Sequence, residues 1–299
     1  MSLQYLSSLF LPSETDEAGY ILDSHNPNMT MTVYDDNVYP FNLFPLRIRG
    51  KIRFSPITVF CGGNGSGKST LLNIIAEALS LDRVSAFNKT HHFASYVSMC
   101  SFELAYGKKV PAGSAIITSD DVFDSLLTRR EENDAIDVRR RELSEEYFAL
   151  RKAPSVLLQS LDEDDIREFR RKNDANRKTP SRFIAERLRE REKRGGSNGE
   201  EAFLYFTKRL DGSALFLLDE PENSLSPRRQ LELVRYIEDS VRFFDCQFII
   251  ATHSPFFTSL RGALIYDLDE TPVRTKKWTE LDGVRTYMEF FRERGSDFQ

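Results

Sequence analysis

Short apolar runs alternate with amphipathic segments over much of the chain. Buried strands are predicted from β-branched and aromatic runs at 56–62, 114–123, 214–220 and 247–252. Helices are predicted at 68–79, where apolar residues recur at helical spacing, and at 226–240, with Pro227 in the first turn. Apolar strands that alternate with helices are typical of a parallel sheet covered on both faces. The predicted fold class is therefore α/β.

From about 122 to 194 the pattern changes, because charged residues dominate and apolar residues thin out to a helical period. Ala153-Pro154 and Thr179-Pro180 are expected to break this segment into helices. We expect a core in two parts, 1–118 and 196–299, separated by a helical insertion lobe at 119–195. About 70 residues folded into two or more helices make a short lobe rather than a long arm. Residues 1–45 are expected to form loops and short edge strands.

Composition narrows the class of protein. The 299 residues are 40% hydrophobic and carry a formal net charge of -5, which argues against a chain built wholesale for nucleic acid. Three cysteines without metal-ligand spacing suit a reducing cytoplasm. No apolar run approaches the roughly 20 residues that span a bilayer, and the N-terminus does not read as a signal peptide. We expect a cytoplasmic protein without membrane contact.

The first candidate for chemistry is "GGNGSGKS" at 62–69, which follows a predicted strand and opens a predicted helix. This is the P-loop pattern, in which glycines let successive N–H groups point at phosphate oxygens and the helix N-terminus adds positive partial charge. Lys68 is expected to reach the β- and γ-phosphates, and Ser69 to offer its hydroxyl to Mg²⁺. The predicted nucleotide-binding residues here are Gly62, Asn64, Gly65, Ser66, Gly67, Lys68, Ser69 and Thr70.

A second motif, "ALFLLDEPENSLSP" at 214–227, places acids at the end of a buried strand. Asp219 is expected at the carboxyl edge of the sheet, where open α/β sheets bind ligands, and is a candidate to hold Mg²⁺ through water. Glu220 follows, and Pro221 forces the chain out of the sheet. A carboxylate there is a candidate general base for an attacking water.

A third motif, "IIATHSPFF" at 249–257, ends another predicted strand with His253. Most single histidines are structural. This strand, however, is predicted to lie beside the strand that ends at Asp219. His253 is therefore expected near the γ-phosphate.

The stretch "RGGSNGEEAF" at 194–203 resembles a linker until its spacing is examined. Ser197 and Glu200 form a capping box before apolar residues, which predicts a helix start. A helix N-terminus with a serine and free N–H groups is also an anion site. The two interpretations are compatible, because one helix end can serve both.

In this order the four motifs resemble those of the ATP-binding cassette (ABC) ATPases, in particular the non-transporter branch that includes SMC and RecF-like proteins. The resemblance covers roughly 45–80 and 195–270. It implies ATP and Mg²⁺ as cofactors, a homodimer, and a signature at Ser197, Gly199 and Glu200 that grips the γ-phosphate bound to a second subunit. It also implies a D-loop at Asn223, Ser224 and Leu225, with Glu220 as general base and His253 as switch histidine beside the catalytic Lys68.

The chain departs from this family pattern in several places. No glutamine lies where a Q-loop is expected, and Ser119, Asp120 and Asp121 stand there instead. Asp120 is a candidate ligand for Mg²⁺ or water, and Gln159 is an alternative within the lobe. The adenine-stacking residue is not identified, since Tyr39, Phe41 and Phe44 fit core positions better. The basic clusters 139–141 and 170–172 fit a solvated helix face, with a nucleic-acid or partner contact as the alternative.

The resemblance implies an ATPase that dimerises head to tail around two ATP molecules and drives a partner, in bacterial DNA repair or anti-phage defence. The partner would be an effector subunit, such as a nuclease or toxin, encoded nearby. One alternative is the nucleotide-binding subunit of a membrane transporter, against which the missing Q-loop glutamine counts. The other is an ATP-gated sensor or clamp with little turnover, against which Glu220 counts.

Overall fold

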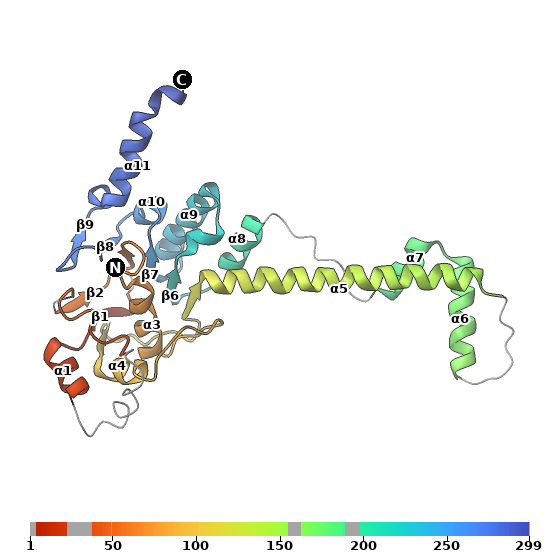
Figure 1. Ribbon diagram of the computed structural model, residues 1–299, viewed down its shortest axis with the longest axis horizontal. Coiled ribbons are helices and arrows are strands. Elements are labelled where there is room, and N and C mark those ends of the chain that lie inside the picture. The colour runs from red at the N-terminus through yellow and green to blue at the C-terminus, as the bar shows by residue number, and fades with distance from the viewer. Residues whose placement is uncertain (1–3, 23–37, 49, 155–162, 189–197, 299) are drawn as a thin grey trace. The chain divides into compact units, whose positions relative to one another are not determined.

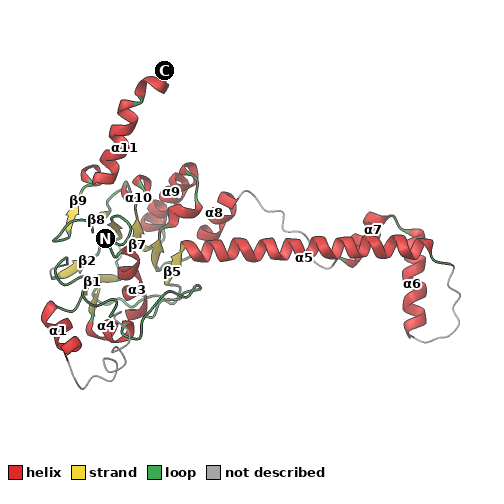
Figure 2. Cartoon of the chain, in the orientation of Figure 1, coloured by secondary structure: helices red, strands yellow, loops and turns green. Residues whose placement is uncertain are grey.

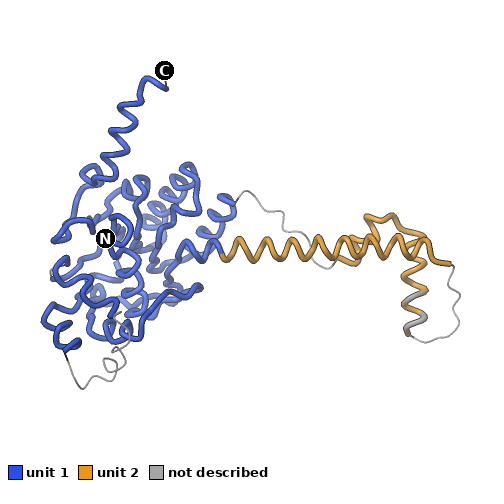
Figure 3. The backbone as a smooth tube through the Cα atoms, viewed as in Figure 1, with its two compact units in different colours: residues 1–123, 197–299 blue, residues 124–196 orange. Residues whose placement is uncertain are grey.

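The structure is a computed structural model that describes residues 4–22, 38–48, 50–154, 163–188 and 198–298. By compactness the chain divides into two units (Figure 3). Unit 1 comprises residues 1–123 together with 197–299, and unit 2 comprises residues 124–196. The helix α5 (Ser119–Lys152) begins in unit 1 and continues into unit 2.

Unit 1 contains a six-stranded sheet in the order β5-β6-β7-β3-β8-β9 (Figures 1 and 2). Its strands are β3 (Ile57–Cys61), β5 (Ala115–Thr118), β6 (Leu215–Asp219), β7 (Gln247–Thr252), β8 (Leu264–Asp267) and β9 (Arg274–Lys276). The first five pair in parallel, and β9 is antiparallel to β8. The prediction of strands within 56–62, 114–123, 214–220 and 247–252, and of a parallel sheet, is confirmed.

Helices cover both faces of this sheet. The helix α3 (Lys68–Ala78) contributes Leu71, Ile74 and Ile75 to the hydrophobic cluster that contains Leu215 and Leu217 of β6. The alternate residues of β6 point to the other face and are also fully buried. Further helices described in unit 1 include α4 (Phe93–Met99), α8 (Asn198–Arg209), α9 (Pro227–Phe243), α10 (Pro255–Thr258) and α11 (Asp282–Glu293), with short 3₁₀ turns at η2 (Pro221–Ser224), η3 (Trp278–Glu280) and η4 (Gly295–Phe298).

A second, antiparallel sheet was not predicted. It has the order β2-β1-β4, formed by β1 (Leu6–Phe10), β2 (Lys51–Arg53) and β4 (Ser101–Leu104). The expectation of loops and edge strands over 1–45 is wrong where α1 (Glu14–Leu22) forms. Ser13 and Asp16 cap this helix reciprocally, since Ser13 N donates to Asp16 Oδ2 at 2.9 Å and Asp16 N to Ser13 Oγ at 3.3 Å. The spacing of Ser13 and Asp16 in the sequence is that of a capping box.

Unit 2 has a small core of its own. Besides α5 it contains α6 (Glu163–Arg177) and α7 (Pro180–Arg187), so the helix breaks at 153–154 and 179–180 fall as predicted. Tyr147, Ala175 and Phe183 are buried together, one from each helix. The buried Lys172 ammonium donates to the carbonyls of Leu150 and Ala153, and thereby satisfies acceptors at the C-terminal end of α5.

One buried amide joins the two sheets of unit 1. Gln247, at the start of β7, is fully buried. Its Oε1 accepts from the N–H groups of Tyr5 and Leu6, each at 2.8 Å, and its Nε2 donates to the carbonyls of Leu6 at 2.9 Å and Ser55 at 3.1 Å. All four hydrogen-bonding positions of the amide are used, and they fix β1 against the central sheet.

We expect Gln247→Leu to lower the free energy of unfolding by roughly 3 kcal/mol, because it leaves buried backbone donors and acceptors without partners. Urea titration followed by circular dichroism measures this. Gln4→Leu is the matched control: Gln4 Nε2 also donates to Leu6 O, at 2.9 Å, but the side chain is only partly buried and water can replace it. Equal losses in the two variants would contradict this account.

Candidate functional site

The P-loop spans the turn from β3 to α3, as its sequence predicts. Gly67, the N-cap of α3, has φ 96°, and a Cβ there would lie 2.9 Å from Phe44 Cε1. A side chain at this position would therefore be strained by its backbone and would collide with a buried ring. Gly62 is similarly confined, since a Cβ would lie 2.7 Å from Ser66 Oγ. The loop backbone can curl this tightly because these residues are glycines.

Two side chains hold the P-loop against the hairpin of β8 and β9. Gly63 N donates to both carboxylate oxygens of Asp269 at 2.9 Å. Arg47 Nη1 donates to Ser66 O at 3.0 Å, while its Nη2 donates to Leu268 O. The loop is thus preorganised by contacts that sequence inspection did not identify.

Lys68 is only 4% exposed and lies folded over the loop. Its Nζ donates to Gly62 O at 2.8 Å and to Gly63 O at 2.9 Å, and lies 3.8 Å from Glu220 Oε1. A buried ammonium that donates to neutral carbonyls is stabilised further when a polyanion binds beside it. The position suits a phosphate ligand.

Ser69 and Asp219 meet between α3 and β6, with Ser69 Oγ donating to Asp219 Oδ1 at 2.9 Å. The pKa of Asp219 is raised to about 6, chiefly by burial; the hydrogen bond from Ser69 opposes this rise, and the nearby Glu220 contributes to it. A carboxylate that is desolvated and crowded by another acid favours a bound cation. The pair is the serine–aspartate combination that holds Mg²⁺ in P-loop proteins.

Glu220 has a left-handed backbone, with φ 46° and ψ 53°, at the point where β6 turns into η2. This conformation is uncommon for a side-chain-bearing residue and directs the chain out of the sheet. Its side chain is 25% exposed, and Asn223 Nδ2 donates to its Oε2 at 2.9 Å. Glu220 Oε1 also lies 3.9 Å from His253 Nδ1. Lys68, Glu220 and His253 therefore converge on one place.

Strand pairing explains this convergence. In the register of β6 with β7, Asp219 lies opposite Ala251, and β7 also pairs with β3, which leads into the P-loop. His253 follows directly after β7, as predicted, and its side chain is 48% exposed. Asp120 lies just beyond β5, in which Thr118 is opposite Asp219, and it is exposed. Its role stays a prediction.

Sequence reasoning missed the role of Glu222. Its side chain is 6% exposed, and Oε1 lies 3.4 Å from His253 Nδ1. The same oxygen accepts from Thr252 Oγ1 at 2.6 Å and from His253 N at 2.8 Å. An acid two residues after the candidate base, in "LDEPE", was the available signal.

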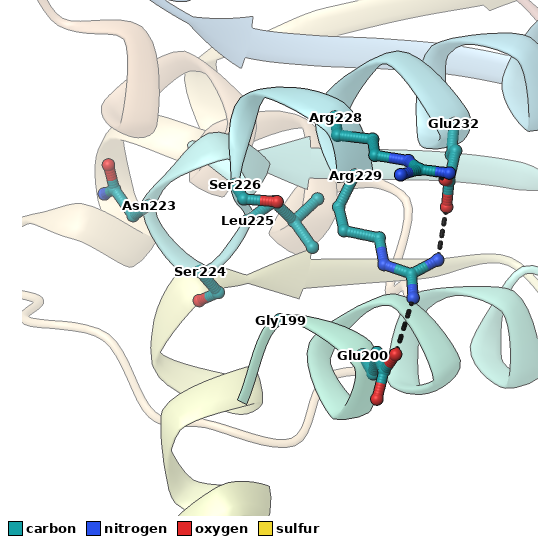
Figure 4. A pocket seen from close by; sticks show the side chains of 9 residues that line it. All are labelled: Gly199, Glu200, Asn223, Ser224, Leu225, Ser226, Arg228, Arg229 and Glu232. Atoms are coloured by element: carbon teal, nitrogen blue, oxygen red, sulfur yellow. Dashed lines mark hydrogen bonds and ion pairs between the residues drawn. The ribbon is translucent and has the colours of Figure 1, made fainter. Parts of the chain in front are cut away.

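The candidate signature lies at a separate hollow of about 630 Å³ (Figure 4). Ser197 lies outside the described residues; Gly199 and Glu200 open α8 and line the hollow together with Asn223, Ser224 and Leu225. Glu200 Oε1 accepts from Arg229 Nη2 at 3.1 Å, which links α8 to α9. Ser224 Oγ is buried without a hydrogen-bond partner in the described structure. Among the described lining residues, none belongs to the P-loop.

The remaining candidates have plainer surroundings. Phe41 and Phe44 are buried in the core, as expected, and Tyr39 OH hydrogen-bonds Thr70 Oγ1 at 2.7 Å. Gln159 lies outside the described residues. In the basic clusters, Arg139 pairs with Glu142 at 2.7 Å, Arg140 with Asp137 at 2.9 Å and Arg171 with Glu146 at 3.5 Å. Such pairs fit a solvated helix face. Lys172 of the second cluster does not, because it is buried and donates to carbonyls at the end of α5.

The residues fit a nucleotide with Mg²⁺. The loop curls so tightly that a Cβ at Gly62 would lie 2.7 Å from Ser66 Oγ, and Ser66 Oγ is buried there without a hydrogen-bond partner among the described residues. One hydroxyl and one carboxylate suit Mg²⁺, which is usually bound by one or two protein ligands together with phosphates and waters. Lys68 would bind phosphate, and Ser69 and Asp219 would hold the ion.

A family model described as "AAA domain, putative AbiEii toxin, Type IV TA system" matches residues 82–259, which is more than half of the chain. The chain belongs to this family. The matched region of this AAA family contains Asp219, Glu220 and His253, whereas the P-loop at 62–69 precedes it. The parallel sheet with a P-loop between β3 and α3 is the P-loop NTPase fold that the motifs predicted.

Several solved structures resemble the chain at low identity. An Smc head domain from Pyrococcus furiosus is 14% identical with a TM-score of 0.38, covering 81% of this chain and 94% of that one. The structure titled cbiO1 from Clostridium perfringens, part of an ABC transporter complex, is 18% identical with a TM-score of 0.38, covering 86% and 90%. No curated protein matches significantly. None of the described helices has an apolar stretch of membrane-spanning length.

The raised pKa of Asp219 makes stability depend on pH. A folded-state pKa of about 6, above the unfolded value, means that the folded chain binds the proton more tightly, so this contribution is present at low pH and is lost as pH rises through 6. Asp219→Asn keeps the acceptor for Ser69 and removes the charge. We expect it to raise the stability of the nucleotide-free chain by about 2 kcal/mol at pH 8, with the gain shrinking between pH 6 and 4.

Chemical denaturation at several pH values measures this gain. Asp16→Asn is the contrasting control, because hydrogen bonds from Ser13 lower the pKa of Asp16, and its loss should not stabilise the chain at neutral pH. A gain for Asp219→Asn that is independent of pH would show that the carboxylate charge is not its cause.

Proposed function

We propose that the protein hydrolyses ATP at two composite sites formed when two copies dimerise head to tail. The observation that carries this is the division of the motifs into two half-sites. Lys68, Ser69, Asp219, Glu220 and His253 gather around the P-loop, while Gly199, Glu200 and the D-loop line a separate hollow. Each half would complete the other across a dimer.

Two features of this hollow favour a surface that binds a second copy of the chain. Ser224 Oγ is buried there without a hydrogen-bond partner in the described structure, and such groups normally find one. The N-terminus of α8 supplies positive partial charge, which suits a phosphate oxygen. The arrangement favours the anionic end of a nucleotide held by the other copy.

The chemistry follows from the positions of the side chains. Glu220 accepts a proton from a water whose oxygen attacks the γ-phosphorus; the bond from that phosphorus to the β-phosphate oxygen breaks, and ADP leaves with the bonding electrons. Lys68 neutralises charge on the transferred group, and His253 contacts it from the end of β7. Mg²⁺, when held by Ser69 and Asp219, adds charge neutralisation.

The family description bears on the biological role. It names a toxin of a toxin–antitoxin system, so we favour a role in bacterial defence over one in DNA repair. The proposal includes a partner subunit that supplies the effector chemistry, because the motifs identified in this chain are those of nucleotide binding and hydrolysis. ATP-driven closing and opening of the dimer would act on that partner.

Glu220→Gln tests turnover separately from binding. It should keep ATP bound, because Lys68 and Ser69 are intact, while slowing phosphate release by about 10²–10⁴-fold. With ATP and Mg²⁺ the variant should accumulate as a dimer, which size-exclusion chromatography with light scattering detects. Unchanged phosphate release would remove Glu220 from the role of base.

Complementation between two inactive variants tests the dimer. Lys68→Ala removes the P-loop cation, and Gly199→Arg fills the signature hollow; a Cβ at Gly199 meets nothing within 4 Å, so the monomer should tolerate the change. Mixed in equal amounts, the two variants can build one complete site per mixed dimer and should regain part of the ATPase activity that each lacks.

Gly19→Arg is the matched control, since Gly19 lies in the exposed part of α1 and its Cβ also meets nothing within 4 Å. It should keep full activity. A mixture that stays inactive although both variants are folded and Gly19→Arg is active would refute the composite site.

A further inference from the structure

Glu222 is a buried acid to which the catalytic scheme above gives no part. It lies within η2, the single turn that follows the candidate base, and its side chain is 6% exposed. A carboxylate this deep normally needs compensating donors. The groups that donate hydrogen bonds to Glu222 show which segment of the chain it fixes.

A single oxygen of Glu222 binds three successive residues. Oε1 accepts from Thr252 Oγ1 at 2.6 Å, from His253 N at 2.8 Å and from Ser254 N at 3.2 Å. These residues form the turn from β7 to α10, and the carboxylate fixes its backbone. The same oxygen lies 3.4 Å from His253 Nδ1.

This arrangement sets the orientation of the imidazole. A carboxylate facing Nδ1 favours a proton on that nitrogen and leaves Nε2, on the opposite side of the ring, for a ligand. The half-exposed ring can then present Nε2 outward. Among the described residues, Glu222 and Glu220 have carboxylate oxygens within 4 Å of His253 Nδ1, and Lys68 Nζ lies 3.8 Å from Glu220 Oε1.

Glu220 is poorly placed to hold the histidine as well. Its Oε1 lies farther from Nδ1, at 3.9 Å, and its two oxygens already face Lys68 and Asn223. A base must also have an oxygen available to accept a proton from water, and a hydrogen bond from the imidazole N–H would occupy that oxygen. A second, buried acid frees Glu220 for that task.

We propose that Glu222 is the positioning residue for His253: it fixes the turn that carries the histidine and holds its proton on Nδ1, so that Nε2 faces the γ-phosphate of the substrate. The kinetic part of this assignment rests on the proposed ATPase function. The geometric part can be tested without turnover.

The test compares Glu222→Gln, which keeps an acceptor oxygen, with Glu222→Met, which has a similar length and no acceptor. Thr252→Val is the contrasting variant, because it removes the hydrogen bonds of the Thr252 hydroxyl with Glu222 and with Ser254 N but keeps Glu222 and its two backbone donors, His253 N and Ser254 N. In steady-state assays Glu222→Met should lose on the order of 10- to 100-fold in kcat, as expected for a lost carboxylate partner of a histidine. Glu222→Gln should lose less, ATP affinity should stay within about twofold, and Thr252→Val should stay near wild type.

The activity-independent readout is the protonation of the ring nitrogens. Long-range ¹H–¹⁵N correlation spectra of histidine-labelled protein at pH 8.5, assigned with His253→Gln, report which nitrogen carries the proton. The wild type and Glu222→Gln should show the proton on Nδ1 of His253, and Glu222→Met should show both tautomers. In kinetics, Glu222→Met combined with His253→Gln should be no slower than His253→Gln alone, since Glu222 acts through the histidine.

The outcomes separate the two proposals. A wild type without ATPase activity would refute the proposed function, while the spectra would still decide whether Glu222 fixes His253. A folded Glu222→Met with unchanged tautomer or unchanged kcat, or a Thr252→Val that loses as much, would overturn the positioning role. If Glu222→Met does not fold, Glu222→Asp takes its place, because its shorter side chain withdraws the oxygen and should produce the same losses.

Discussion

In the central sheet, β7 lies between β3 and β6, and all three strands run in the same direction. Their carboxyl ends therefore meet at one edge, where the P-loop leaves β3, Asp219 ends β6 and His253 follows β7. Asp219 and His253 are 34 positions apart in sequence, and Lys68 is more than 150 positions from either. Without this parallel pairing, the P-loop, Asp219 and His253 would not lie together.

The sheet edge is also where the chain departs from relaxed geometry. Glu220 has a left-handed backbone, Lys68 is buried, and the pKa of Asp219 is raised by burial. Such features cost stability and persist because the surrounding sheet is fully packed on both faces. A polyanion with a bound cation would relieve the buried ammonium and the crowded carboxylates together. These unfavourable features therefore lie where a ligand can offset them.

The sequence predicts the parts of this structure that follow local rules. The strands β3, β5, β6 and β7 are short apolar runs, and α3 and α9 have helical spacing with a glycine or proline start, so periodicity suffices. The sheet of β1, β2 and β4 escapes prediction because it is held by contacts between distant segments, such as the Gln247 amide with Tyr5. Glu222 escapes for the same reason, since its partners come from β7. The clamp of Asp269 on Gly63 joins residues 206 positions apart.

Three acids lie within four residues of one another, and their surroundings separate them. Asp219 is desolvated and receives one hydroxyl, which suits a carboxylate that a cation will neutralise. Glu220 is the most exposed of the three and is held on one oxygen by an amide, which suits proton transfer with water. Glu222 is buried and receives three donors on one oxygen, which suits a fixed anion. Differences in access to water and in the number of donors thus suit the same functional group to three different tasks.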